Sequence, residues 1–169
     1  MLNNSFGFRP FLFFLRYHVN KEHKKKGEKV QELRIKYLRD VEHIKQYGNW
    51  IDLRAAEDVH MNKGEWKLIP LGFACKLPDG YEAHLLPRSS TFKKYHILIA
   101  NSTGIIDNAY CGNSDEWMLS AYATEDTFIP KNDRICQFRI MEIQPPMAIT
   151  EVDELEDKDR GGFGSTGSR

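Results

Sequence analysis

The stretch Trp66-Lys67-Leu68-Ile69-Pro70-Leu71-Gly72-Phe73-Ala74-Cys75-Lys76-Leu77 indicates the class of fold more clearly than the rest of the chain. It advances in short apolar steps, ends at the turn sequence Pro78-Asp79-Gly80, and lacks a long helical periodicity. Short apolar runs bounded by proline, aspartate and glycine are typical of β-strands joined by turns. The stretch therefore predicts strands rather than a helix.

Similar segments recur on both sides of it, with further turn sequences at residues 62–64 and 130–133. We expect strands at residues 33–38, 81–86, 97–100, 117–122 and 135–143. One short helix is expected at residues 91–95, with Ser89 or Ser90 as its cap. Many short strands at this spacing favour an all-β, antiparallel fold, a sandwich or jelly roll.

The stretch Gly104-Ile105-Ile106-Asp107-Asn108-Ala109-Tyr110-Cys111-Gly112 is the strongest candidate for function. Two isoleucines favour a strand, and glycine at both ends permits close approach or positive φ. We expect a β-hairpin that holds Asp107 and Tyr110 at its tip and binds a flat ligand through main-chain groups. The alternative is an ordinary hairpin whose aspartate caps a turn and whose tyrosine packs on the sheet.

Composition limits the classes of partner. The chain has 169 residues, 41% of them apolar, which suits one domain with a substantial core. Its 24 basic residues balance 24 acidic ones, and this balance argues against nucleic acid as the main partner. Three widely spaced cysteines lack a C-x-x-C pair, so we expect no disulfide framework and a reducing, cytoplasmic location.

Residues 1–32 differ from the rest of the chain. Residues 8–19 are apolar and aromatic, but two arginines interrupt them and they are too short for a membrane span, so we expect no membrane. The charged run at residues 21–29 follows the apolar part, which is not the order of a signal peptide. Three alternatives stay open: a translated upstream segment without a fold, an extension that binds a partner or a membrane surface, and a packed helix.

Two polar segments are candidates for phosphate binding. Pro87-Arg88-Ser89-Ser90 places a guanidinium and two hydroxyls at the start of the expected helix, a combination that suits a phosphate. Helix capping alone also accounts for the serines. Residues 160–169 are rich in glycine and carry Phe163, so this end of the chain either closes over a ligand as a lid or has no fixed structure.

The order of these segments resembles a known family. The matching segments are Asp52-Leu53-Arg54-Ala55-Ala56, Pro87-Arg88-Ser89-Ser90, the stretch from Asn101 to Gly112, Arg134-Ile135-Cys136-Gln137 and the stretch from Arg160 to Gly167. Together they resemble the five ordered motifs of the trimeric deoxyuridine triphosphate diphosphatases (dUTPases). The resemblance covers roughly residues 33–169. It implies a jelly-roll β-clip domain with a glycine-rich C-terminal arm at residues 158–169, a homotrimer, and sites shared between subunits.

The resemblance also implies an activity and residue roles. The reaction would be hydrolysis of dUTP to dUMP and pyrophosphate, which limits uracil in DNA and supplies dUMP for dTMP synthesis. Asp107 would be the general base, Asp52 would hold Mg²⁺ through water, and Tyr110 would pack on the deoxyribose. Uracil would pair near Asn101, Gly104 and Ile106, and Phe163 would stack on it. The phosphates and their water would be held by Arg88, Ser89, Ser90, Arg134, Gln137, Arg160, Gly164, Ser165 and Thr166.

Departures from the family pattern leave alternatives open. Arg160 precedes Phe163 by fewer residues than is usual, so Lys158 is a second candidate for the cation of the last motif. Trp117 either packs in the sheet or covers the base. A dCTP deaminase would need a glutamate where Met118-Leu119-Ser120 stands. A dUTP-binding regulatory protein without catalysis is the other alternative.

Overall fold

The computed structural model describes residues 31–155 and 157–159. Its contacts divide the chain into two units, Met1–Glu32 and Leu33–Arg169, and the description that follows concerns the second. The expectations for residues 1–30 and for arm residues 160–169 fall outside the described residues.

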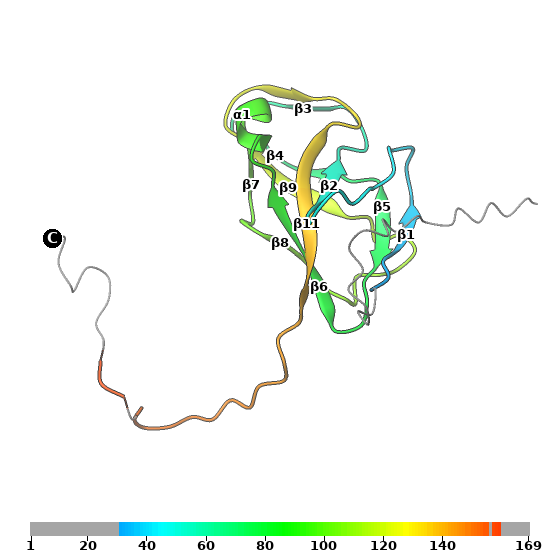
Figure 1. The fold of residues 1–169 in the computed structure, drawn as a ribbon. Helices are drawn as coiled ribbons and strands as arrows, with labels where there is room; N and C mark the ends of the chain where they lie inside the picture. Colours follow the sequence, from blue (N-terminus) through cyan, green and yellow to red (C-terminus); the bar gives the residue numbers. More distant parts are fainter. Residues whose placement is uncertain (1–30, 156, 160–169) are drawn as a thin grey trace, which may run out of the picture. The chain divides into compact units, whose positions relative to one another are not determined.

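The described chain is built almost entirely of short strands (Figure 1). The single helix among the described residues is α1, Thr91–Tyr95. The strands are β1 (Arg34–Tyr37), β2 (Ile51–Arg54), β3 (Val59–Met61), β4 (Trp66–Pro70), β5 (Phe73–Lys76), β6 (Tyr81–Pro87), β7 (Ile97–Ile99), β8 (Gly104–Ile106), β9 (Met118–Ala123), β10 (Thr127–Ile129) and β11 (Arg134–Glu142). The prediction of an all-β fold with one short helix is confirmed.

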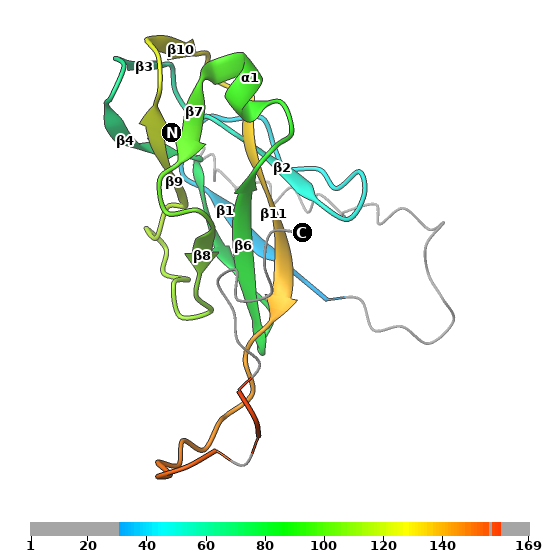
Figure 2. The same cartoon turned by 90° about the vertical axis from the view of Figure 1, so that its left-hand side faces the viewer.

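The strands pair antiparallel in four sheets. The largest sheet has the order β2-β11-β6-β8, and Figure 2 shows β6 running between β11 and β8. A three-stranded sheet has the order β4-β9-β7, and two ribbons pair β1 with β5 and β3 with β10. The predicted antiparallel pairing is therefore confirmed. Strands β2, β3 and β10, each three or four residues long, were not predicted.

An aromatic cluster joins the sheets in the core. Trp117 is fully buried, with its ring centroid 5.0 Å from that of Phe73 in β5 and 5.1 Å from that of Phe138 in β11. Burying rings of this size supplies a large part of the apolar stabilisation of a domain. The expectation that Trp117 packs within the sheet is confirmed, so it does not cover a base.

Two local predictions were wrong in detail. Residues 104–112 do not form a two-stranded hairpin: β8 pairs with β6, and residues 107–117 form turns and irregular backbone. The helix begins as predicted, but Ser90 makes no side-chain cap bond. Instead, the hydroxyl of buried Thr91 accepts a hydrogen bond from the Arg88 N–H at 2.9 Å and donates one to the Ile135 carbonyl at 2.9 Å.

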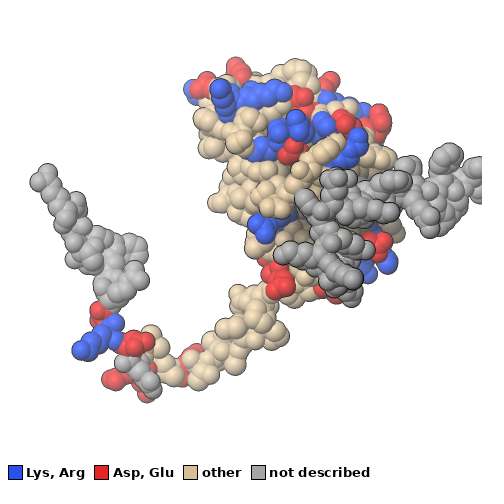
Figure 3. All heavy atoms as spheres, in the orientation of Figure 1, with Lys and Arg blue, Asp and Glu red and all other residues tan. Residues whose placement is uncertain are grey.

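The surface carries charges of both signs. Figure 3 shows basic and acidic side chains intermingled on the visible face of the described domain. Among the described residues, no helix is both long and apolar enough to span a membrane.

Candidate functional site

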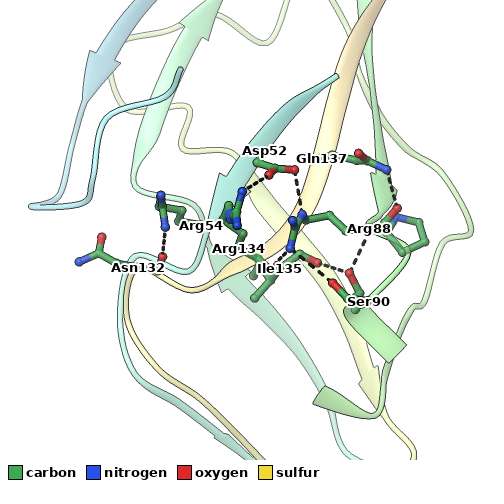
Figure 4. A network of polar contacts seen from close by, with 10 residues as sticks. Asp52, Arg54, Arg88, Ser90, Asn132, Arg134, Ile135 and Gln137 are labelled. Carbon is green, nitrogen blue, oxygen red and sulfur yellow. Dashed lines mark hydrogen bonds and ion pairs between the residues drawn. The ribbon is translucent and has the colours of Figure 1, made fainter. Parts of the chain in front are cut away.

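Asp52, Arg88 and Arg134 meet in one polar cluster, although they are far apart in the sequence (Figure 4). Asp52 lies in β2, Arg88 follows β6, and Arg134 begins β11, the strand that pairs with both β2 and β6. The Asp52 Oδ1 accepts from the Arg88 Nε at 2.8 Å, and the Oδ2 accepts from the Arg134 Nη1 at 2.9 Å. One carboxylate thus orients two guanidinium groups.

A β-bulge in β11 makes this cluster possible. The register of β11 against β2 shifts between Arg134 and Cys136, so that Ile135 and Cys136 are both fully buried. In a regular strand, residues three apart point to opposite faces. The bulge brings Arg134 onto the same face as Gln137, which lies directly opposite Asp52. Gln137 donates from Nε2 to the Pro87 carbonyl at 3.0 Å.

Arg88 is fixed from several sides. Its Nη1 contacts the Ser90 hydroxyl at 3.5 Å and the Arg134 carbonyl at 3.3 Å, while the Thr91 bond holds its backbone. Its Nη2 makes no hydrogen bond within the described part of the chain. The adjacent Ser89 is exposed. The cluster therefore presents donors that are oriented and able to bind an anion.

The chemistry of Asp52 fits a water-mediated metal contact. Each carboxylate oxygen already accepts one hydrogen bond, and each has a second lone pair. Mg²⁺ keeps several waters when it binds protein, and such a water can donate to that lone pair. The described residues hold no group of three or more His, Cys, Asp or Glu side chains that would bind a metal directly.

Asp107 lies directly after β8 and is exposed. Its Oδ1 accepts from the Ala109 N–H at 2.6 Å, and its carbonyl accepts from the Tyr110 N–H at 3.1 Å. These local bonds fix the carboxylate in a turn. The other oxygen, Oδ2, has no hydrogen bond to any residue that the structure describes, so it can accept one from water.

The strand before Asp107 is an outer strand of its sheet, so one of its edges is not paired in the described sheet. Gly104 sits close to Leu85: a Cβ at position 104 would lie 3.1 Å from the Leu85 Cβ. Ile106 is half-buried and Asn101 is exposed. The Tyr110 side chain is exposed, and its hydroxyl donates to the Glu116 carbonyl at 3.1 Å. Main-chain groups and an aromatic ring therefore flank Asp107.

Asp107 and the arginine cluster lie at opposite ends of β6. Ile106 is opposite Ala83, whereas Arg88 follows the other end of the strand. At about 3.3 Å per residue, positions 83 and 88 are roughly 16 Å apart. The backbone positions of Asp107 and Arg88 are therefore well separated along the same strand of the sheet. The remaining predicted residues Arg160, Phe163, Gly164, Ser165 and Thr166 lie outside the described residues, and Lys158 is exposed.

Neither buried cysteine is suited to nucleophilic chemistry. Burial raises the pKa of the Cys75 thiol to about 12 and raises that of Cys136 as well. Cys111 is exposed, and all three cysteines are free.

Thr91, which holds Arg88, was not predicted as a site residue. Its position directly after Pro87-Arg88-Ser89-Ser90, at the start of the expected helix, was the indication that the sequence offered.

Comparison with known proteins identifies the family. The dUTPase family model matches residues 50–167. The chain is 52% identical over 141 residues to the SPbeta prophage-derived deoxyuridine 5'-triphosphate nucleotidohydrolase YosS of Bacillus subtilis, covering 82% of this chain and 99% of that protein. It is 40% identical to the deoxyuridine 5'-triphosphate nucleotidohydrolase of Nautilia profundicola over 118 residues, 69% of this chain and 82% of the relative.

Solved structures support the fold. The dUTPase of Staphylococcus bacteriophage 80alpha with dUpNHpp superposes with a TM-score of 0.67 at 23% identity, covering 80% of this chain and 98% of that one. The dUTPase of the S. aureus phage phi11, described with a structural Mg(II) ion, gives a TM-score of 0.65 at 21% identity over 75% of this chain and 99% of that one. With its motifs in the order of the family and a matched region that spans most of its length, the chain belongs to the dUTPase family.

Proposed function

We propose that the chain hydrolyses dUTP to dUMP and pyrophosphate, with Asp107 as the general base. The observation that carries the proposal is the pairing of two features. One is a cluster of oriented guanidinium groups, and the other is an exposed carboxylate directly after the outer strand β8. The family and its curated relatives support the choice of substrate.

The arginine cluster is proposed to bind the triphosphate. Arg88 offers Nη2, Arg134 is half-exposed, and Ser89 and Ser90 add hydroxyl donors. Asp52 keeps both guanidinium groups in position, so little reorganisation is needed when the anion binds. Gln137 and the arm residues 160–166 complete the phosphate contacts in this proposal. Preorganised positive charge is the main source of rate acceleration in phosphoryl transfer.

Asp107 is proposed to orient a water molecule through Oδ2 and to accept its proton. The water attacks the α-phosphorus, the bond to the pyrophosphate oxygen breaks, and dUMP and pyrophosphate leave. Mg²⁺, when bound, would draw electron density from the phosphate oxygens, and Asp52 would hold it through water. A mutant of the phi11 dUTPase is described with a structural Mg(II) ion, so a protein of this fold can bind the metal.

Selection of uracil and deoxyribose is assigned to β8 and the residues beside it. The outer edge of Gly104–Ile106, with Asn101, offers main-chain donors and acceptors in a fixed order. A thymine methyl would collide with this edge. Cytosine would place its amino group, a hydrogen-bond donor, where uracil has a carbonyl that accepts from a main-chain N–H. The Tyr110 ring would pack on the sugar and leave a 2′-hydroxyl unpaired, at a cost of about 1–3 kcal/mol. Phe163 would stack on the base as the arm closes.

We propose a homotrimer with shared sites, and the separation of Asp107 and Arg88 along β6 supports this proposal. Exposed apolar side chains supply surface for assembly: Trp66 and Leu68 on β4, and Ile149 and Leu155 in the segment after β11. The number of subunits is taken from the family. A reducing, cytoplasmic location is proposed because all three thiols are free.

A substrate panel tests the proposal. Purified protein is given dUTP, UTP, dTTP or dCTP, with and without Mg²⁺, and pyrophosphate, monophosphate and ammonia are quantified. We expect pyrophosphate and dUMP from dUTP alone, in a reaction that needs Mg²⁺. Intact dUTP, equal cleavage of UTP, or ammonia release from dCTP would overturn the proposal.

A further inference from the structure

Tyr110 depends on a distant part of the chain for its position. Its hydroxyl donates to the backbone carbonyl of Glu116 at 3.1 Å, near the end of the loop between β8 and β9. Tyr110 is 42% exposed, so this bond constrains a side chain that is not buried in the core. The placement of the Glu116 carbonyl therefore contributes to the position of the ring.

Arg39 holds Glu116. The Arg39 Nε donates to the Glu116 Oε1 at 2.7 Å, and the Nη2 donates to the Oε2 at 3.1 Å. Such a bidentate pair fixes direction as well as distance. The Glu116 side chain is only 12% exposed, so water screens the pair less than it would screen a surface ion pair. The third nitrogen of the guanidinium, Nη1, donates to Glu57 at 2.7 Å.

The same carboxylate is tied to a rigid turn. The Gly72 N–H donates to the Glu116 Oε1 at 3.0 Å, and the Gly72 carbonyl accepts from Leu38 and Arg39 N–H groups at 2.8 and 3.2 Å. Gly72 has φ +83°, and a Cβ there would lie 2.7 Å from the Val41 Cγ1. Another residue at this position would be strained and would clash. The turn is thus a fixed platform for Glu116.

A second contact runs between the same segments. Lys36 in β1 donates from Nζ to the Asn113 carbonyl at 2.9 Å. Both Lys36 and Arg39 precede the region that the family model matches, which begins at residue 50. The loop that carries Tyr110 is therefore held in part by residues that lie before the range matched by the family model.

We propose that Arg39 and Glu116 are positioning residues for Tyr110 and thereby set the discrimination between deoxyribonucleotide and ribonucleotide. This inference rests on the proposed function, in which the Tyr110 ring packs on the sugar. Loss of the Arg39–Glu116 pair lets the Glu116 carbonyl and the ring move. The 2′-hydroxyl of a ribonucleotide then finds room, while the phosphate contacts of Arg88 stay unchanged.

The test compares kcat/KM for dUTP and UTP, together with calorimetric affinities for dUpNHpp and UpNHpp. In Arg39→Gln, we expect the ratio of dUTP to UTP for both quantities to fall about tenfold, because small displacements of positioning groups have large effects. Arg39→Lys, which keeps one contact, should recover part of the ratio. Tyr110→Phe, which keeps the ring and loses the bond to Glu116, should lower the ratio in the same direction.

Lys63→Gln is the matched control, since it removes the same charge from an exposed pair with Glu125 whose side chains are 67% and 56% exposed. Its ratio should equal that of the wild type. An unchanged ratio in folded Arg39→Gln and Tyr110→Phe, alongside a discriminating wild type, overturns the inference and leaves the proposed function intact. A wild type that neither binds nor cleaves dUTP overturns both. If Arg39→Gln does not fold, Arg39→Lys and Tyr110→Phe decide the question.

Discussion

At the scale of single residues, the two aspartates of the proposed site differ in their hydrogen bonds. Asp107 is exposed with one oxygen free of described partners, whereas Asp52 has both oxygens committed to arginines. The surroundings of the two aspartates therefore differ in the way that their proposed roles require.

We predict that Asp107→Asn strongly lowers the rate of turnover and leaves dUTP binding in place. An amide keeps the shape and an acceptor oxygen but cannot take a proton, so the rate of dUTP hydrolysis should fall by about 10²–10⁴. Single-turnover hydrolysis and calorimetric binding of dUpNHpp measure the two effects. Full turnover in Asp107→Asn would contradict the assignment of the base.

Cysteine reactivity gives a second prediction. Since burial raises the pKa of Cys75 to about 12 and that of Cys136 also upward, neither forms thiolate near neutral pH. A thiol reagent at pH 8 should label Cys111 rapidly and the other two only after unfolding. Labelling should disappear in native Cys111→Ser. Rapid native labelling of a second cysteine would show that the core opens readily.

At the scale of elements, α1 is secured by a buried hydroxyl rather than by a serine cap. The serine before the short helix correctly predicted where the helix begins. The predicted serine cap was wrong, because the hydrogen bonds are made by the Thr91 hydroxyl. Only the position of β11 beside the helix start decides that the Thr91 hydroxyl, and not that of Ser90, has a carbonyl within reach.

We expect Thr91→Val to lower the free energy of unfolding by about 2–3 kcal/mol, because it leaves the Arg88 N–H and the Ile135 carbonyl without a partner. Ser90→Ala is the control and should change it by less than about 0.5 kcal/mol. Urea denaturation followed by tryptophan fluorescence measures both. Equal effects of the two substitutions would argue against this account of the helix start.

The strand pattern correctly predicted several strands. Of the hairpin expected at residues 104–112, it correctly predicted the first strand, β8. β8 forms as expected, but residues 107–115 satisfy their backbone locally: Asp107 accepts from Ala109, and Asp115 accepts from the Gly112 N–H at 2.6 Å. Side chains that compete for backbone donors prevent a second strand from pairing. The sequence shows these aspartates, but it does not show which donors they take.

At the scale of the whole molecule, Asp107 and Arg88 lie toward opposite ends of β6, and the proposal of sites shared between subunits can be tested on this basis. We predict that Asp107→Asn and Arg88→Ala chains are each inactive and regain activity when mixed. In randomly assembled trimers, roughly one quarter of the shared sites would carry both intact residues. Mixing after mild unfolding and refolding, followed by a pyrophosphate assay, measures the gain. Lack of any gain would place each site within one chain.

The sequence alone determined the class of fold, the order of the motifs and the residue types of the site, because strand periods and turn residues are local properties. The tertiary structure decided which of those residues meet. The bulge in β11 that turns Arg134 toward Asp52, the Thr91 bond that fixes Arg88 and the reach of Arg39 to Glu116 all join distant segments. Such contacts depend on strand register and on which donor lies closest in space, and neither is a property of neighbouring residues in a chain.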